Sequence, residues 1–328
     1  MRTTIKIIIV LLTLFMISST FSESVSSKDS AYTYTSFEGT SLSLYPYVGR
    51  HIALLVDSPN LDEKTLTTLV DVMDKAYEYY HEITGREPEP SSHYKYQNRS
   101  TVAVVPKTCG YACGYPGSNG IELSSDAFKD LYEGVLSDNL FNQAIFYEFG
   151  RNFWFYGDKL EYKDPDDSNS TITGYAVFMR FMAIEKLGIN AAPFHDQDFD
   201  YFKSEVKKLT DRYLSDPSLN WSNTLKTGNA PSNPMDLGST DLFASFLFKL
   251  NDLFGDEFLT HLWKEVDKRP YSNTTQDAVD NFILAASAAS EKNLTSLFED
   301  HWRWPVSGKA KAEALKLFGP PYIIEEKT

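Results

Sequence analysis

The chain has 328 residues, of which 42% are hydrophobic and 23% charged, and its formal net charge is -14 at pH 7. Nucleic-acid binding needs a concentration of Lys and Arg that this acidic chain lacks, so the composition argues against nucleic acid as a partner. An aromatic content of 14% predicts a well-packed globular protein and excludes a largely disordered one.

Residues 1–22 have the pattern of a secretory signal peptide. Arg2 and Lys6 precede an apolar run over residues 7–17, and small polar residues follow. The run is about half of the ~20 residues that a membrane-spanning helix needs, and no later segment approaches that length without charges. We therefore expect a soluble protein that is secreted or delivered to a vacuole or lysosome, without a membrane span.

Five Asn-x-Ser/Thr tripeptides follow this segment. Their asparagines are Asn98, Asn169, Asn220, Asn273 and Asn293. Such tripeptides also arise by chance, but five of them behind a signal peptide favour a glycoprotein. Each glycosylated asparagine must then lie at the surface.

The N-terminal third is predicted to contain strands. Residues 23–47 are rich in Ser, Thr and Tyr and lack helical periodicity, so we expect an extended or loosely ordered lead. Apolar runs predict buried strands at 51–56 and 101–105, and a shorter strand at 120–123. Between the first two, apolar residues at helical spacing over 66–80 predict an amphipathic helix.

Cys109 and Cys113 are the only cysteines of the chain, and they lie in a Gly-rich loop before the third predicted strand. In an oxidising compartment, two thiols this close are expected to form a small disulfide loop. Half of a metal site is the alternative, although no second pair of cysteines completes it. Two free thiols are the third interpretation.

Helical patterns dominate after residue 126. Helices are predicted at 138–156, 172–187, 198–214, 240–254, 256–268, 274–290 and 308–317. A strand-rich part followed by a helical remainder predicts an α+β fold. We expect a strand-containing N-terminal subdomain over 48–135 and a helical subdomain over 136–328.

Residues 146–154 read Phe-Tyr-Glu-Phe-Gly-Arg-Asn-Phe-Trp and form the most informative stretch. In a His-Glu-x-x-His helix, two imidazoles four residues apart hold zinc and the Glu activates the zinc-bound water. Here Glu148 is kept, but Tyr147 and Arg151 stand at the two ligand positions, and a guanidinium has no lone pair to donate. The stretch also fits an ordinary core helix with a Phe/Trp face.

This organisation resembles the gluzincin metallopeptidases, the thermolysin-type fold, mainly over residues 50–190. The resemblance implies that Glu148 corresponds to the general base and that a third zinc ligand, usually Glu, comes from the next helix. The matching place precedes Gly174 and holds Thr173. All three zinc ligands are then replaced, and ordinary zinc catalysis is not expected.

The acidic loop over residues 158–169 is a second candidate for a metal site. Its carboxylates belong to Asp158, Glu161, Asp164, Asp166 and Asp167. Calcium takes six to eight oxygen ligands, but the spacing departs from the Asp-x-Asp-x-Asp-Gly pattern. A solvated loop is the simpler interpretation, and calcium is the alternative.

Three functions remain open. The preferred one is a secreted, catalytically degenerate glycoprotein that binds an extracellular peptide, protein or glycan in the former cleft, with Arg151, Asn152, Trp154 and Tyr175 as binding residues. Arg151 would pair with Glu148 or another buried carboxylate, because an unpaired buried charge is costly. The alternative is an atypical secreted hydrolase or peptidase that uses Glu148, with Tyr147 as proton donor or phenolate ligand. The third is a structural or matrix protein in which the cleft has no role.

Overall fold

The computed structural model describes residues 25–26, 30–194 and 196–323. The predicted signal peptide lies outside these ranges. The described strands are β1 (Val25–Ser26), β2 (Tyr32–Thr35), β3 (Ser41–Val48), β4 (Ile52–Val56), β5 (Lys95–Tyr96), β6 (Arg99–Val105), β7 (Ala112–Gly114) and β8 (Ile121–Ser124). They pair in the order β1-β3-β4-β6-β8-β7, with β2 added on β3 and β5 on β6. The pairs β4–β6 and β6–β8 are parallel and the others antiparallel.

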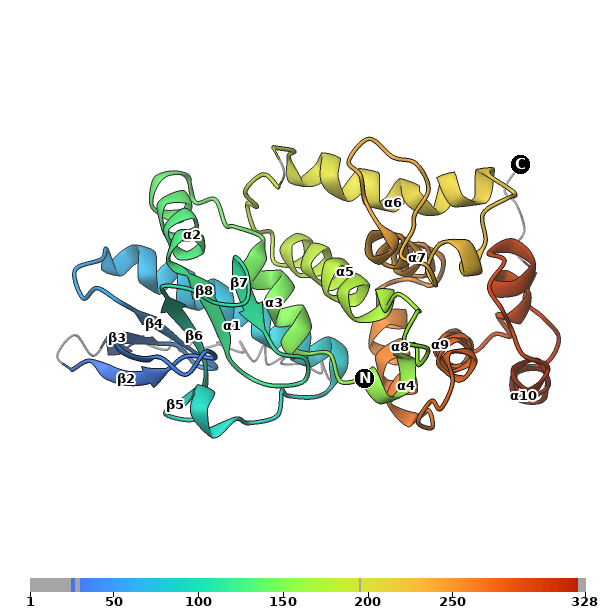
Figure 1. The fold of residues 1–328 in the computed structure, drawn as a ribbon, viewed down its shortest axis with the longest axis horizontal. Coiled ribbons are helices and arrows are strands. Elements are labelled where there is room, and N and C mark those ends of the chain that lie inside the picture. Colours follow the sequence, from blue (N-terminus) through green and yellow to red (C-terminus); the bar gives the residue numbers. More distant parts are fainter. Residues whose placement is uncertain (1–24, 27–29, 195, 324–328) are drawn as a thin grey trace, which may run out of the picture.

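Helices make up most of the remaining chain. They are α1 (Glu63–Thr84), α2 (Ser125–Asp138), α3 (Ala144–Asn152), α4 (Gly157–Leu160), α5 (Ser170–Lys186), α6 (Phe199–Ser215), α7 (Ser239–Phe254), α8 (Asp256–Lys268), α9 (Thr275–Ser290) and α10 (Gly308–Phe318). The strands with α1 and α2 form one side of the molecule, and α5 to α10 form the other (Figure 1). This arrangement confirms the predicted α+β fold.

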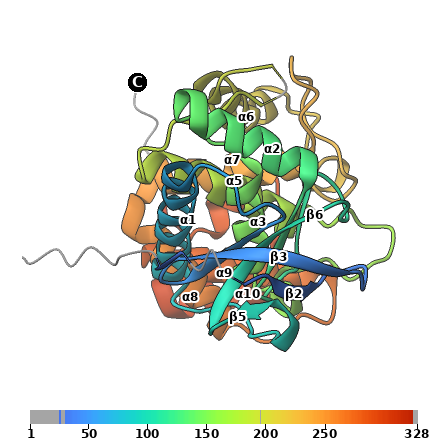
Figure 2. The same ribbon diagram turned by 90° about the vertical axis from the view of Figure 1, so that its left-hand side faces the viewer.

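The two faces of the sheet are covered differently. Alternate residues of the central strands, such as Leu54, Val102 and Leu123, pack with α1, α2 and α3 in the main hydrophobic core. The opposite face is covered by side chains from the N-terminal strands, including Tyr34 and Leu44. Figure 2 shows α1 and α2 above the strands and β2 and β5 below them.

The N-terminal lead is more ordered than the sequence predicts. Its described residues from 30 onward form β2 and most of β3, because alternate residues there fill the second face of the sheet. The buried carboxylate of Glu122 on β8 holds this hairpin: it accepts hydrogen bonds from the Tyr34 hydroxyl at 3.1 Å and the Phe37 N–H at 2.7 Å. A third bond, from the Thr108 hydroxyl at 2.8 Å, ties the loop before β7 to the same group.

The predicted helix over 138–156 is wrong in its bounds. Ser124 caps a separate α2, which the sequence analysis missed, and α2 ends where Asn139 adopts a φ of 53°. The chain re-enters a helix only at α3 and leaves it at Phe153, where the aromatic side chains turn into the core. The strands at 51–56, 101–105 and 120–123 and the other predicted helices are confirmed within a few residues.

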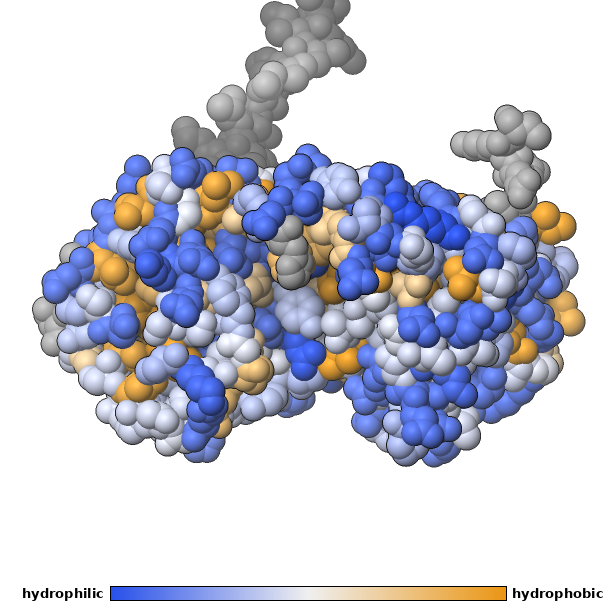
Figure 3. Space-filling view, turned by 45° about the horizontal axis from the view of Figure 1, so that its top comes forward, coloured by the Kyte–Doolittle hydropathy of each residue, from blue (hydrophilic) through white to orange (hydrophobic). Residues whose placement is uncertain are grey.

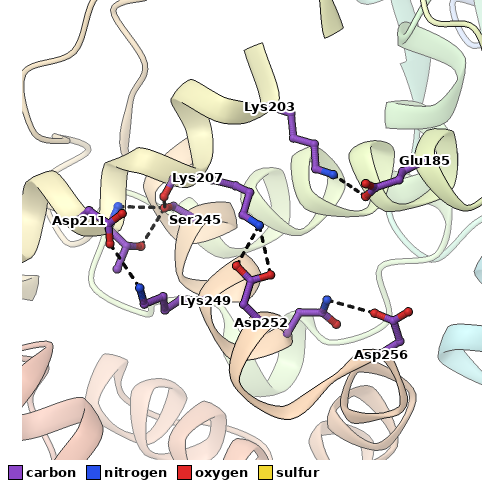
Figure 4. A network of polar contacts seen from close by, with 10 residues as sticks. Glu185, Lys203, Lys207, Asp211, Ser245, Lys249, Asp252 and Asp256 are labelled. Carbon is purple, nitrogen blue, oxygen red and sulfur yellow. Dashed lines mark hydrogen bonds and ion pairs between the residues drawn. The ribbon is translucent and has the colours of Figure 1, made fainter. Parts of the chain in front are cut away.

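The helical side carries a layer of polar contacts (Figure 4). On its surface, Lys207 pairs with Asp252 at 2.9 Å, an exposed contact of the kind that contributes little on its own. Beneath it, the buried Ser245 hydroxyl of α7 accepts the Thr210 N–H of α6 at 2.9 Å and donates to the Lys207 carbonyl at 3.0 Å. The buried hydroxyl therefore links α6 to α7 more firmly than the surface charges do. Within the described ranges, none of the helices has the length and apolar character of a membrane span.

Candidate functional site

A cavity of about 470 Å³ lies where α3, α5, α6 and the start of α7 meet the edge of the sheet. Its charged lining residues are Glu148, Arg180, Asp236 and Asp241, and its aromatic lining residues are Tyr111, Tyr147, Phe194 and Phe202. Figure 3 shows the surface hollowed between the strand-rich and helical sides, with hydrophobic residues visible in the hollow. The cavity therefore brings together two predicted residues, Tyr147 and Glu148, with several that the sequence analysis did not select.

Packing sets the position of α3. Its buried Phe146 and Phe149 face the core, and Gly150 lies so close to α5 that a Cβ there would be 2.8 Å from the Ala176 Cα. This contact turns Tyr147 and Glu148 toward the cavity and Arg151 toward β7.

Two side chains of α3 clamp the edge strand β7 at Gly114. The Arg151 Nε donates to the Gly114 carbonyl at 3.2 Å. The Gly114 N–H donates to the Glu148 carboxylate. Since β7 ends the main sheet, these two contacts satisfy backbone groups that an edge strand otherwise leaves open. Arg151 thus binds a backbone carbonyl, while its charge acts on Glu148 at longer range.

Burial dominates the electrostatics of Glu148, whose residue is only 6% exposed. Desolvation raises the pKa of the carboxyl to about 7, although Arg151 and the Gly114 N–H both lower it. Near neutral pH the group is therefore divided between its protonated and ionised forms.

Arg180 of α5 is the functional candidate that the sequence analysis missed. It is 4% exposed, and its guanidinium lies over the rings of Phe181, Phe194 and Phe202 at 4.8, 5.0 and 4.9 Å. Its Nε is buried without a hydrogen-bond partner among the described residues. Burial lowers the pKa of Arg180 to about 10, while the charge of Asp241 raises it. A lone Arg within the apolar run of α5 was the available signal.

Three of the predicted binding residues lie in the interior, outside the lining of the cavity. Asn152 donates from its Nδ2 to the carbonyls of Tyr115 at 3.1 Å and Gly120 at 3.2 Å. Trp154 and Tyr175 are buried against each other, with ring centroids 5.2 Å apart, and both pack on Trp263. Their placement gives them the role of supporting α3 and α5, so we do not retain them as ligand contacts.

The residues at the positions that the gluzincin resemblance assigns to zinc ligands do not fit zinc. Tyr147 and Arg151 occupy two of them, and on α5 the cavity is lined by Val177 and Arg180, whereas Thr173 is not part of the lining. Within the described ranges, no three His, Cys, Asp or Glu residues are grouped so that they could hold a metal ion. A tetrahedral zinc site draws its ligands from these residue types.

The carboxylates of the acidic loop make contacts within the loop and with neighbouring segments. The Asp164 carboxylate accepts the N–H of Asp166 at 3.1 Å. The Asp167 carboxylate accepts the Thr275 hydroxyl at 2.6 Å and faces Lys226 at 3.5 Å. The calcium alternative, which also invoked Asp158 and Glu161, finds no suitable cluster in the described part of this loop.

The predicted disulfide between Cys109 and Cys113 is confirmed. The loop that it closes carries Tyr111, whose ring lines the cavity. The Tyr111 hydroxyl donates to Asp130 at 2.5 Å and accepts from the Asn142 amide at 3.1 Å. The loop is thereby held as a wall of the cavity.

The five predicted glycosylation sites are not equivalent. Asn98 and Asn273 are exposed, and Asn169 and Asn220 are half-buried. Asn293 is only 2% exposed, and its amide donates to the Gly319 carbonyl at 2.8 Å and accepts the Thr295 hydroxyl at 2.6 Å. The expectation that all five lie at the surface is therefore wrong for Asn293, because its side chain joins the segment after α9 to the end of α10.

No known protein family and no curated protein sequence matches this chain. Among solved structures, it is similar to a functionally unknown conserved protein, as a mutant, of Bacillus anthracis str. Ames, with a TM-score of 0.59 and 14% identity over 86% of this chain and 53% of that one. It is also similar to the M60 catalytic domain of Clostridium perfringens ZmpC in complex with the sialyl T antigen, with a TM-score of 0.53 and 15% identity over 86% and 50% of the two chains. The catalytic module of the metalloprotease ZmpA from the same species gives a TM-score of 0.50 and 12% identity over 84% and 48%.

The chain spans about half the length of these structures. At such low identities the likeness concerns the fold alone, and not the residues of the site. The chain has a metallopeptidase-like fold.

Proposed function

We propose that this protein is a secreted glycoprotein that binds a peptide, protein or glycan in the cavity beside Glu148, and that its gluzincin-like scaffold lacks a peptidase zinc site. The observation that carries the proposal is the cavity of about 470 Å³, in which Glu148 and Arg180 face aromatic walls. Cavities of this size and mixed lining are typical of ligand sites. The replacement of zinc ligands by Tyr147 and Arg151 supports binding over zinc-dependent cleavage.

The lining favours a compact ligand over a long extended strand. Aromatic faces such as Tyr147 and Phe202 suit apolar or sugar C–H surfaces, while Arg180 is able to donate hydrogen bonds to a ligand and Asp241 to accept them. An extended peptide would ordinarily pair with the edge strand β7, but Glu148 and Arg151 already bind it at Gly114. The sialyl T antigen bound by the ZmpC domain makes a glycopeptide the first ligand to test.

Elemental analysis tests the absence of the zinc site. The protein, purified from the secreting host and dialysed without chelator, is expected to hold far less than one zinc per chain. One zinc per chain that survives dialysis, and that Glu148→Gln leaves in place, would overturn the proposal that the peptidase zinc site is absent.

Calorimetric titration with O-glycosylated peptides tests the cavity. Ala144 lines it and is half-buried, so Ala144→Phe should fill the space and weaken binding at least about tenfold, the loss of one good contact. Ala312→Phe is the matched control, because Ala312 is exposed on α10. Equal affinity in both variants would place binding elsewhere.

A hydrolase that uses Glu148 is the second candidate, and the pKa of about 7 for this buried carboxyl favours it. A general acid or base works best when its pKa lies near the working pH. The Tyr147 hydroxyl in the same cavity would be a proton donor. Under this candidate, Glu148→Gln abolishes turnover of a bound substrate while affinity is retained. Wild-type protein that binds a glycopeptide without cleaving it would reject the candidate.

A further inference from the structure

The Nε of Arg180 lacks the backbone acceptor that the Nε of the half-buried Arg303 has. Arg303 also lies over an aromatic ring, that of Tyr213, at 4.8 Å. Its Nε donates to the Leu219 carbonyl at 2.6 Å, and an Nη donates to the Tyr213 carbonyl at 2.6 Å. The Nε of Arg180 is buried and has no such acceptor within the described ranges. A buried polar group without a partner is costly, and the cost of a charged one is larger.

The nearby carboxylates are engaged elsewhere. Asp241 accepts the Gly238 N–H at 3.1 Å and lies in the first turn of α7, where the helix dipole favours its charge. Glu148 is bound to the Gly114 N–H, and Asp236 is exposed. Asp241 and Arg180 shift each other's pKa, so the two charges interact across the cavity. The nearby carboxylates therefore leave the Arg180 guanidinium, a cation in the cavity, without a hydrogen-bond acceptor for its Nε.

We propose that Arg180 is the anchor for a carboxylate group of the ligand, and that the ligand carries an apolar or aromatic group beside that carboxylate. This inference rests on the proposed function, because it names the chemistry that the cavity selects. A planar carboxylate matches the guanidinium fork and supplies the acceptor that Arg180 lacks. The rings of Phe194 and Phe202 and the side chains of Val177 and Leu237 form the apolar part of the lining.

The charge around Arg180 selects a monoanion over a dianion. Glu148 and Asp241 line the same cavity, and each negative charge added to the ligand is repelled by them. A phosphate dianion therefore gains less from Arg180 than a carboxylate does. The end of a peptide chain with an aromatic or aliphatic last residue has the required combination of groups.

The experiment compares two probes that differ in one group, N-acetyl-phenylalanine and N-acetyl-phenylalanine amide, by calorimetric titration of the full-length secreted protein at pH 7. We expect the acid to bind at least about tenfold more tightly than the amide, as charge-assisted hydrogen bonds are the stronger ones. Inorganic phosphate and sulfate are titrated in parallel and are expected to compete weakly with the acid. Competition as strong as that of the acid itself would show a general anion site and overturn the assignment to a carboxylate.

Two variants test whether Arg180 causes the preference for the acid over the amide. Arg180→Met should remove the preference for the acid, and Arg180→Lys should retain only part of it because a Lys lacks the planar fork. If Arg180→Met does not fold, the acid and the amide are compared on the wild-type protein and on Ala144→Phe. That comparison still shows whether the cavity prefers the carboxylate. A preference that persists in folded Arg180→Met would contradict the inference.

Failure of this inference is distinguishable from failure of the proposed function. Equal binding of acid and amide, with both lost in Ala144→Phe, overturns the role of Arg180 and keeps the cavity as a binding site. Binding of neither probe overturns the inference, and the glycopeptide titration then decides the proposed function by itself.

Discussion

At the residue scale, the stretch from Tyr147 to Arg151 forms a contact between α3 and the edge strand β7. The Glu148 carboxylate accepts the N–H of Gly114 on the edge strand, and the Arg151 Nε donates to the carbonyl of the same residue. Glycine suits this position because a Cβ would make tight contacts, 3.0 Å from the Glu148 carbonyl oxygen and 3.1 Å from its Oε2. Glu148 is thus part of a contact between α3 and β7, whether or not it also contacts a ligand.

The raised pKa of Glu148 predicts a pH dependence of folding stability. The folded pKa is about 7 and the ordinary value is 4.5, so ionisation is harder in the folded protein. The contribution of this group to the free energy of unfolding is therefore fully present below pH 4.5 and is lost as the pH rises through 7. The loss amounts to about 3 kcal/mol.

Urea unfolding of wild type and Glu148→Gln at pH 5 and pH 8 measures this contribution. A Gln can still accept the Gly114 N–H, so the variant should lack the pH-dependent part and gain stability relative to wild type at the higher pH. Other buried acids, among them Glu122 and Asp241, titrate in both proteins and cancel in the comparison. A constant difference between the two proteins at both pH values would contradict the prediction.

Burial also predicts which glycosylation sites are used. If the chain enters the secretory pathway, Asn98 and Asn273 should carry glycans, because both are exposed. Asn293 should not, since its amide is bound inside the fold. Mass spectrometry of peptides after enzymatic removal of N-glycans in ¹⁸O water checks this directly. A fully occupied Asn293 in folded protein would contradict the structure around α10.

At the element scale, glycines decide how closely the helices cross. The contact of Gly150 with Ala176 brings α3 against α5. Two residues earlier on α5, a Cβ on Gly174 would lie 2.6 Å from the Thr240 carbonyl of α7. Both contacts are with backbone atoms, which cannot rotate away as a side chain does. Three of the helices around the cavity, α3, α5 and α7, therefore owe their separation to residues without a side chain.

Gly174→Ala should separate α5 from α7 and lower the free energy of unfolding by about 1–3 kcal/mol, despite the better helix propensity of Ala. Gly308→Ala is the matched control, because Gly308 begins α10 and a Cβ there has no neighbour within 4 Å. The control should be neutral or slightly stabilising. Thermal unfolding of both variants checks the prediction, and equal midpoints would show that the crossing is not tight.

At the scale of the whole molecule, one hydrophobic cluster joins the strand-rich and helical sides. It runs from Leu54 and Val102 of the sheet through Phe149 of α3 to Trp263 and Trp302. An ion pair between Arg86 and Asp267, at 2.8 Å, also connects the segment just after α1 to α8. The division into subdomains at residues 48–135 and 136–328 stays a prediction, and the shared core makes a separate unfolding of the two unfavourable.

We therefore expect a single cooperative unfolding transition. The chain has five Trp residues, at positions 154, 221, 263, 302 and 304, all of them in the helical part. Trp fluorescence thus reports on that part, whereas far-ultraviolet circular dichroism reports on the entire chain. The two curves in urea should coincide, as they do for two-state unfolding. An earlier transition by circular dichroism alone would show that the sheet unfolds independently.

Local patterns were sufficient to predict much of the fold. The apolar runs of β4 and β6, the periodicity of α1 and the spacing of Cys109 and Cys113 depend on neighbours in the sequence, and the structure confirms all of them. The same local reasoning failed at residues 138–156, where aromatic residues continue a helical pattern after the helix has ended.

The sequence by itself therefore determined the α+β order of elements and singled out the stretch from Tyr147 to Arg151, because the repeat of hydrophobic residues along a strand or helix is a local property. Only the tertiary structure decided which face of each element meets the core and which meets the cavity. It turned Trp154 and Tyr175 inward, buried Asn293, and brought Arg180 from a separate helix to the side of Glu148. These outcomes depend on contacts between segments far apart in the chain, and no pattern within a single element records them.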